Sequence, residues 1–311
     1  MDMVSIVIPV YNREKFIRQA IESCLLQTYK NLEIIIYDNL STDNTWNICQ
    51  EYSKLHAKIQ LYQNIKNLGP VLNWENCIKK CNGKYVKVLF SDDLLYHQCI
   101  ELMVNKFTDE ISFVFSSINI GKIPNEIKNH YCWKRKAGLY SASEYISQLF
   151  WGSRVPVSPG ASLFRLIDLN DWIQYRKGNY ELKQFDNNGA GLDALMFLIA
   201  AKNQKKIAYI KKPQVFFRIH EDSFTVKNEF NEVSENYKKF FLWFARKEYE
   251  AELSKKIFLK YWLKACKNDK RFISVKNLST RYGFILEESF LKLFIKYFLQ
   301  MLFLNIYWRF K

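Results

Sequence analysis

The chain has 311 residues, 49% of them hydrophobic, and a formal net charge of +15. This length and hydrophobicity exclude a globally disordered chain and allow one large domain, or a catalytic domain with an appendage. Residues 226–311 contain 18 Lys or Arg against 9 Asp or Glu, so +9 of the charge lies there, which indicates an anionic partner, either nucleic acid or an anionic membrane surface.

Strand-like and helix-like patterns alternate over the first 120 residues. Short apolar runs alternating with amphipathic segments are typical of βαβ units and a mostly parallel sheet flanked by helices. Ser41 is expected to cap the second helix, and Pro70 to begin the third. The predicted strands are 4–10, 32–37, 58–63 and 85–90, and the predicted helices are 14–27, 41–52 and 70–81.

The pattern is looser after residue 120. Residues 121–140 are expected to form a loop, and Ser141 with Glu144 predicts a capping box for a helix over 141–150. Sheet signals stop near residue 225, which divides a first domain, 1–225, from a basic, aromatic-rich helical region, 226–311. The other predicted elements are strands 111–117 and 207–220, the latter broken by Pro213, and helices 192–202, 234–267 and 285–311.

The seven cysteines show no metal-binding spacing. An odd number of cysteines and the lack of a secretory signal favour a reducing compartment. The first strand-like run begins at residue 4, so no targeting segment is expected before the fold, and a cytoplasmic location is predicted.

Polar side chains follow each of the first four predicted strands. Ligands of open α/β sheets bind beyond the carboxyl ends of the strands, so we expect these side chains at one edge of the sheet. Asp43 is equally compatible with a plain charge at a helix start. The residues at these strand ends are Pro9, Tyr11 and Asn12; Asp38, Asn39, Ser41 and Asp43; Asn67 and Gly69; and Asp92 and Asp93.

Asp92 and Asp93 are adjacent like charges, and each disfavours ionisation of the other. A divalent cation removes this repulsion, and Mg²⁺ is commonly held by one or two carboxylates together with substrate phosphates. A solvated turn is the alternative for the pair alone. The chain has no glycine-rich phosphate loop, so any bound phosphate must be neutralised by metal and basic side chains.

Four segments occur in an order that resembles the family-2 glycosyltransferases with the GT-A fold: "SIVIPVYN" (5–12), "LEIIIYDNLSTDNT" (32–45), "NLGPVLNWENCIKKCNGKYVKVLFSDD" (67–93) and "GLDALMFL" (191–198). The third resembles members that build bacterial surface polysaccharides such as O-antigen and capsule. The resemblance implies a nucleotide-sugar site with a DxD-type motif. In it, Pro9, Tyr11 and Asn12 form the base pocket, Asp38 contacts the base, Asn67 contributes to donor binding, Asp92 faces the ribose or metal, and Asp93 ligates Mg²⁺ or Mn²⁺.

The chain departs from the family pattern at two places. The usual "DDGS" is "DNLS", so Asn39 and Leu40 replace an Asp and a Gly. The usual "DADD" is "FSDD", with Phe90 in place of the first Asp. Asp38 and the final Asp pair are kept.

The resemblance also implies a general base that takes a proton from the acceptor hydroxyl. The matching position is Asp193, which also fits plain helix capping, and Asp186 is the alternative. "FFRIHEDSFT" (216–225) resembles a late family loop in which Arg218 and His220 reach the diphosphate or metal. A hydrogen bond within the fold is the other interpretation of His220. "SPGASLFR" (158–165) resembles a segment flanking the acceptor pocket and makes Ser162 a weak candidate.

Residues 289–311 contain 16 apolar or aromatic and 4 basic residues and no acidic ones. The longest stretch without charge, 297–308, is too short for a bilayer span, which needs about 20 residues. An interfacial helix at a membrane surface is one interpretation, and the basic, aromatic segment 246–271 supports it. A core or oligomer helix is the other.

These observations predict an inverting, metal-dependent glycosyltransferase. It would move a sugar, by family habit from a UDP-sugar, to a glycan or an undecaprenyl-diphosphate-linked oligosaccharide at the inner face of the cytoplasmic membrane. A catalytically inactive scaffold of a polysaccharide assembly complex is the first alternative. A nucleic-acid-binding protein is the second, although the chain has no recognised nucleic-acid motif and places carboxylates at the strand ends.

Overall fold

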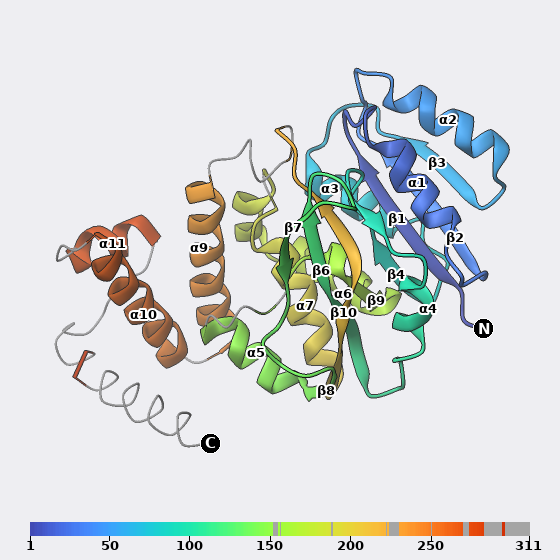
Figure 1. The fold of residues 1–311 in the computed structure, drawn as a ribbon. Coiled ribbons are helices and arrows are strands. Elements are labelled where there is room, and N and C mark those ends of the chain that lie inside the picture. Colours follow the sequence, from blue (N-terminus) through green and yellow to red (C-terminus); the bar gives the residue numbers. More distant parts are fainter. Residues whose placement is uncertain are drawn as a thin grey trace. The chain divides into compact units, whose positions relative to one another are not determined.

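The computed structural model describes residues 1–151, 155, 157–187, 189–221, 223, 230–249, 251–269, 274–282 and 294–295. The chain divides into two compact units, Met1–Phe230 and Asn231–Lys311. The first unit contains the sheet and all the described strands, and the second contains α-helices (Figure 1).

The first half of the sheet is parallel, as the sequence predicts. Its strands lie in the order β3, β2, β1, β4, and Val7 of the central strand faces Ile35 on one side and Val88 on the other. These strands are almost continuously buried, which explains their apolar runs. Their bounds are β1 Val4–Val10, β2 Leu32–Asp38, β3 Ile59–Gln63 and β4 Tyr85–Val88.

The second half of the sheet is mixed. β9 lies antiparallel between β4 and β6, and β6 then pairs in parallel with β10. β10 runs through Pro213 with a register shift between Ile210 and Val215, so the predicted break is an irregularity within one strand. The bounds are β5 Leu94–Leu95, β6 Ile111–Gly121, β9 Ser162–Arg165 and β10 Lys206–Arg218.

The predicted loop over 121–140 is wrong, because it contains two edge strands. β7 (Ile127–Tyr131) pairs with β6, and β8 (Gly138–Ser141) pairs with β10. Both are largely exposed. The sequence shows no alternation of apolar and polar residues there, because neither strand buries a face against the core.

Helices cover both faces of the sheet. Alternate β1 residues, including Ile6 and Ile8, pack in one core cluster with side chains of α1, α2 and α4. On the other face α3 contacts β1, β2 and α6, and α7 contacts α5, α6 and β6. The bounds are α1 Ile17–Leu25, α2 Thr45–Leu55, α3 Pro70–Ile78, α4 Cys99–Val104, α5 Ala142–Trp151, α6 Leu166–Gly178 and α7 Leu192–Asn203, with 3₁₀ turns at Pro159–Ala161 and Tyr180–Phe185.

Two predicted helix caps have different outcomes. The N–H of Glu144 donates to the hydroxyl of Ser141 at 3.1 Å, which confirms that half of the predicted box. Ser41 is not the cap of α2, which begins at Thr45. Its hydroxyl and its N–H both bond to Asp38, so the four residues before α2 form a loop instead of a helical turn.

The second unit has helices α9 (Phe230–Glu248), α10 (Ala251–Asp269) and α11 (Val275–Tyr282), so the predicted helix 234–267 is divided in two. Phe240, Phe244, Ile257 and Trp262 of these helices are buried. In the part of the chain that the structure describes, no helix is both long and apolar enough to cross a bilayer. The predicted helix 285–311 lies outside the described residues except for residues 294–295.

Asp168 in the first turn of α6 provides a test of this packing. It is 1% exposed, and burial raises the pKa of its carboxyl to about 6. The folded state therefore binds the proton more tightly than the unfolded chain, and folding stability falls as pH rises from about 4 to 6. In Asp168→Asn this loss is absent, so the variant's unfolding free energy relative to wild type is expected to increase by about 2 to 3 kcal/mol between pH 4 and pH 8.

Urea unfolding at the two pH values measures this difference. Asp171→Asn is the matched control, because Asp171 is exposed on the same helix and also accepts a hydrogen bond from Asn203. The prediction would be contradicted if the unfolding free energy of Asp168→Asn relative to wild type were the same at both pH values.

Candidate active site

Asn12 joins the loops that follow β1 and β2. Its backbone is left-handed (φ 50°), its N–H donates to the Ser41 hydroxyl at 2.9 Å, and its side-chain oxygen accepts the N–H of Thr42 at 2.8 Å. Asparagine is among the few residues that adopt this conformation readily. Of the other residues of the predicted base pocket, Pro9 is buried in β1 and Tyr11 is 39% exposed just beyond it.

Asp38 is fully buried at the end of β2. Its carboxylate accepts the N–H of Ser41 at 3.0 Å, the side-chain amide of Gln63 at 2.9 Å, and the Ser41 hydroxyl. Both oxygens are therefore engaged by the chain. An ionised carboxylate can accept about four hydrogen bonds, so one acceptor position of Asp38 is left for the predicted contact with a nucleobase.

Asn39 links β2 to the segment that leads into α3. Its amide nitrogen donates to Asn67 at 2.8 Å, and its oxygen accepts from Asn64 at 2.8 Å and from the N–H of Leu68 at 2.9 Å. An ionised Asp only accepts hydrogen bonds, whereas an Asn both donates and accepts. The departure from the family pattern at this position therefore fits a neutral amide network that also holds Asn67.

Leu40 occupies the position where the family pattern has Gly, and it has φ 62°. Left-handed backbone costs a side chain with a Cβ roughly 1 to 2 kcal/mol, and Gly escapes this cost. The side chain is 39% exposed, so its removal loses little core packing.

Leu40→Gly is therefore expected to raise the unfolding free energy by roughly 0.5 to 1 kcal/mol, the strain relieved less the entropy that Gly adds to the unfolded chain. Urea unfolding measures it. Leu55→Gly is the control of opposite sign, because Leu55 is also exposed but lies in α2. Equal destabilisation by both substitutions would contradict the prediction.

Asp92 and Asp93 lie just beyond β4 in different surroundings. An Asp92 oxygen lies 3.0 Å from Nε2 of His220 and 3.4 Å from Nε of Arg13. Burial acts to raise the pKa of Asp92, but the hydrogen bond with His220 and the charge of Arg13 outweigh it and hold the pKa below its usual value. Burial, followed by the charge of Asp92, raises the pKa of Asp93 well above its usual value.

Arg218 and His220, at and just after the end of β10, contact this pair. The N–H of Arg218 donates to Asp93 at 2.9 Å, and its guanidinium donates to the carbonyl of Asp92 at 2.9 Å. Phe16 packs against both side chains, 4.4 Å from the His220 ring centroid and 5.0 Å from the guanidinium carbon. Nδ1 of His220 is buried and has no hydrogen-bond partner among the described residues.

The carboxylate oxygens of Asp92 and Asp93 fit a hard divalent cation whose remaining ligands come from the substrate. The structure shows, within its described ranges, no group of three or more His, Cys, Asp or Glu side chains that could hold a metal ion. Two carboxylates plus phosphate oxygens are the usual ligands of Mg²⁺, so the Asp pair suffices on the protein side. Burial and the charge of Asp92 keep the pKa of Asp93 high, although the nearby charges of Lys87 and Arg218 act to lower it.

Asp193 is the second residue of α7, and the residue that precedes the helix is Gly191 with φ 96°. One of its oxygens accepts the N–H groups of Gly191 at 3.0 Å and Ala194 at 2.7 Å. The alternative, Asp186, pairs with buried Arg176 at 3.1 Å, which in turn bonds Glu75 at 2.8 Å. Asp186 is thus part of a buried ion-pair cluster, which leaves Asp193 as the better candidate base.

Three further residues are Ser162, Arg13 and Lys87. Ser162, the weak acceptor-side candidate, is fully buried at the start of β9. Arg13 was not predicted, and nothing in the sequence distinguishes it from a surface cation. Lys87 was also missed, although a Lys inside the apolar run of β4 was a usable signal. It is fully buried, it donates to the carbonyls of Val88 (2.8 Å) and Gly160, and burial lowers its pKa to about 8.

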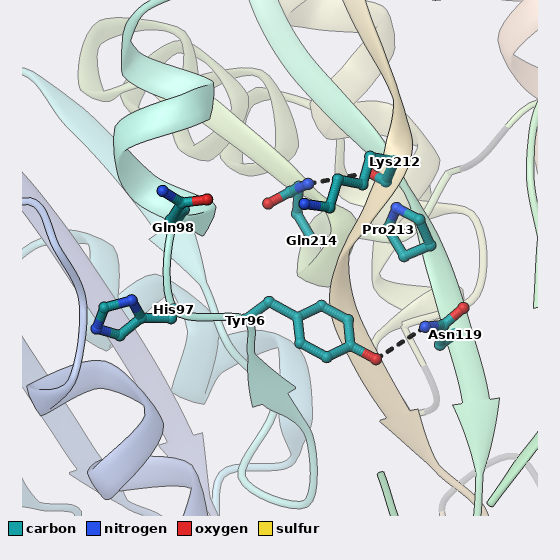
Figure 2. Close-up of a pocket in the computed structure, with 7 residues that line it drawn as sticks. All are labelled: Tyr96, His97, Gln98, Asn119, Lys212, Pro213 and Gln214. Carbon is teal, nitrogen blue, oxygen red and sulfur yellow. Dashed lines mark hydrogen bonds between the residues drawn. The ribbon is translucent and has the colours of Figure 1, made fainter. Parts of the chain in front are cut away.

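A hollow of about 450 Å³ lies elsewhere in the first unit (Figure 2). The Tyr96 hydroxyl accepts a hydrogen bond from Asn119 at 2.8 Å beside Lys212, Pro213 and Gln214. β5 pairs with residues 215–216 of β10, so these lining residues and Arg218 lie at opposite ends of that pairing. None of the predicted site residues is among the described residues that line the hollow.

Comparison with known proteins gives the family. The model of Glycosyl transferase family 2 matches residues 5–168, more than half of the chain. The chain belongs to this family. The match includes β1, the loops after β1 and β2, and the Asp pair.

Individual proteins agree with the family. Chondroitin synthase of Escherichia coli is 36% identical over 151 residues, which are 47% of this chain and 21% of that protein. The first curated relatives are all much longer, and the chain spans about a fifth to a quarter of their length.

Solved structures share the GT-A fold. TarS residues 1–349 of S. aureus in complex with UDP-GlcNAc matches 83% of this chain and 70% of that one, with a TM-score of 0.60 and 19% identity. The mannosyltransferase PcManGT of Pyrobaculum calidifontis, in complex with GDP-Man and Mn²⁺, matches 90% of this chain and 84% of that one, with a TM-score of 0.50 and 14% identity.

Proposed function

We propose that this chain is an inverting glycosyltransferase that moves a sugar from a UDP-sugar to a hydroxyl of a glycan. The observation that carries the proposal is the Asp92–Asp93 pair, beyond a central strand of a family-2 fold, with Arg218 and His220 against it. The complex of TarS with UDP-GlcNAc supports a UDP-sugar as donor.

The donor lies along the edge formed by the ends of β1, β2 and β4. Pro9, Tyr11, Asn12, Asp38 and Asn67 bind the nucleoside. Asp93 and Asp92, with His220 beside them, hold Mg²⁺ or Mn²⁺, a role that the Mn²⁺ complex of PcManGT supports. When bound, the metal neutralises charge on the diphosphate. Arg218 adds a fixed positive charge on the same side.

Asp193 acts as the general base. It takes the proton of the acceptor hydroxyl while that oxygen forms a bond to the anomeric carbon. The bond from that carbon to the diphosphate oxygen breaks on the opposite side, so the configuration inverts and the nucleoside diphosphate leaves. The N–H groups of Gly191 and Ala194 hold one carboxylate oxygen of Asp193 at the start of α7.

The acceptor is a glycan of a bacterial surface polysaccharide, free or linked to a lipid diphosphate. The similarity to chondroitin synthase supports a polysaccharide product. A lipid-linked acceptor fits the basic, aromatic C-terminal region, which we propose to associate with the inner face of the cytoplasmic membrane.

Asp93→Asn tests the donor site. The substitution removes a carboxylate from the pair, so the affinity for UDP in the presence of Mn²⁺ is expected to fall at least about tenfold, the loss of a charged ligand. The stability of the unliganded protein should hold or rise, because a buried carboxyl is replaced by a neutral amide. Calorimetric titration of UDP with and without Mn²⁺ measures the first effect, and thermal unfolding measures the second. Wild-type affinity that still responds to Mn²⁺ would remove Asp93 as a ligand.

Asp193→Asn tests the base. The amide keeps an oxygen for the N–H groups of Gly191 and Ala194, so the helix start is preserved. It accepts no proton, so sugar transfer should slow by at least about 100-fold, with UDP affinity changed by less than about twofold. Asp186→Asn is the matched control, because it loosens the ion pair with Arg176 and lowers stability but should retain turnover. The reverse pattern of turnover would identify Asp186 as the base.

A further inference from the structure

Three aromatic side chains, Trp74, Phe90 and Phe217, form an aromatic wall in which Phe90 and Phe217 pack against Gly160 and Trp74 packs against Phe90. The Trp74 and Phe90 ring centroids are 6.0 Å apart. A Cβ placed on Gly160 would lie 3.2 Å from the rings of both Phe90 and Phe217. Only a residue without a side chain lets both rings approach this closely.

One end of this aromatic wall adjoins the Asp pair. The carbonyl of Phe90 accepts the N–H of Asp93 at 3.0 Å. Phe217 directly precedes Arg218, whose N–H bonds to Asp93. The two phenyl groups therefore come from the segment just after β4 and from the end of β10, and both segments contact the proposed diphosphate anchor.

The other end of the wall adjoins the start of α7. A Cβ on Gly189 would lie 2.8 Å from the Trp74 indole, so this glycine (φ 69°) also allows a close approach. The carbonyl of Gly189 accepts the N–H of Asp193 at 3.3 Å. The wall thus extends from the Asp pair to the segment that carries Asp193.

The wall is partly exposed, unlike the aromatic cluster around Phe113 in the same unit. Trp74, Phe90 and Phe217 all keep some solvent contact, whereas Phe113, Phe164 and the other rings packed with them are fully buried. Accessible aromatic faces beside a few charged groups are typical of ligand sites. Phe90, moreover, stands where the family pattern has Asp.

We propose that Trp74, supported by Phe90, stacks against a pyranose ring of the acceptor. The inference rests on the proposed function, in which the donor sugar and the acceptor sugar lie between the diphosphate anchor and the base. Trp74 is the member of the wall that touches the segment before Asp193, so it meets the ring whose hydroxyl is deprotonated. Pyranoses present axial C–H groups on one face, and these groups pack on the negative face of an aromatic ring.

The test uses saturation-transfer NMR on the full chain with UDP and Mg²⁺, and methyl β-D-glucopyranoside as the probe. In the wild type, saturation is expected to be strongest on the axial protons that share one face of the sugar. Trp74→Ala should reduce the signal at least about fivefold, and Trp74→Phe should keep more than about half, because an aromatic face remains. Tyr180→Ala is the control, because it removes a ring that is 76% exposed outside the wall.

The outcomes separate the two proposals. If the wild type binds UDP, two results overturn the stacking site alone. One is a glycoside signal that is unchanged in Trp74→Ala, and the other is the absence of any glycoside signal. A wild type that binds no UDP overturns the proposed function and the stacking site with it. Loss of the glycoside signal in Trp74→Ala with thermal unfolding and UDP affinity close to wild type supports the inference.

Discussion

The unequal pair Asp92–Asp93 is the constraint around which this edge of the sheet is built. Asp92 has its charge compensated by Arg13 and His220, whereas Asp93 receives only the N–H of Arg218 among the hydrogen bonds described for it. Two adjacent carboxylates in partly buried surroundings are costly unless cations or N–H groups surround them. The groups that do so come from the ends of β1 and β10, which are remote in sequence from β4, so the pair can be accommodated only when the complete sheet has formed.

The antiparallel strand β9 positions a second segment of the chain beside the Asp pair's strand, β4. β9 lies between β4 and β6 and places the turn before it, including Gly160, against β4. Buried Lys87 bonds to Gly160 and to the carbonyl of Val88, so it fixes that turn to the strand that leads to the Asp pair. A buried ammonium is tolerated because carbonyls accept its protons and Asp93 lies close enough to favour its charge.

The sequence predicted the parallel half of the sheet well, because each of its strands is a buried apolar run separated from the next by a helix. The structure shows Arg218 and His220 against the Asp pair, whereas their contact with a diphosphate or metal stays a prediction from a family motif. The edge strand β7 and the inserted strand β9 were missed, because long-range antiparallel pairing leaves no signal in a segment that is short or exposed. The position of Ser41 was also misjudged, because its hydroxyl bonds to Asp38 more favourably than to a helix start.

The departures from the family pattern follow one physical theme. Asn39 and Phe90 each replace a carboxylate with a neutral side chain at the edge where a diphosphate is proposed to bind. Asn39 joins an amide network, and Phe90 joins Trp74 and Phe217 in the aromatic wall. Removing two carboxylates lowers the repulsion toward an anionic ligand and leaves Asp38 and the Asp pair as the acidic groups carried over from the pattern. In the proposed site, the metal and Arg218 would then meet the charge of the diphosphate, while Asn39 and Phe90 add neutral hydrogen bonds and aromatic surface.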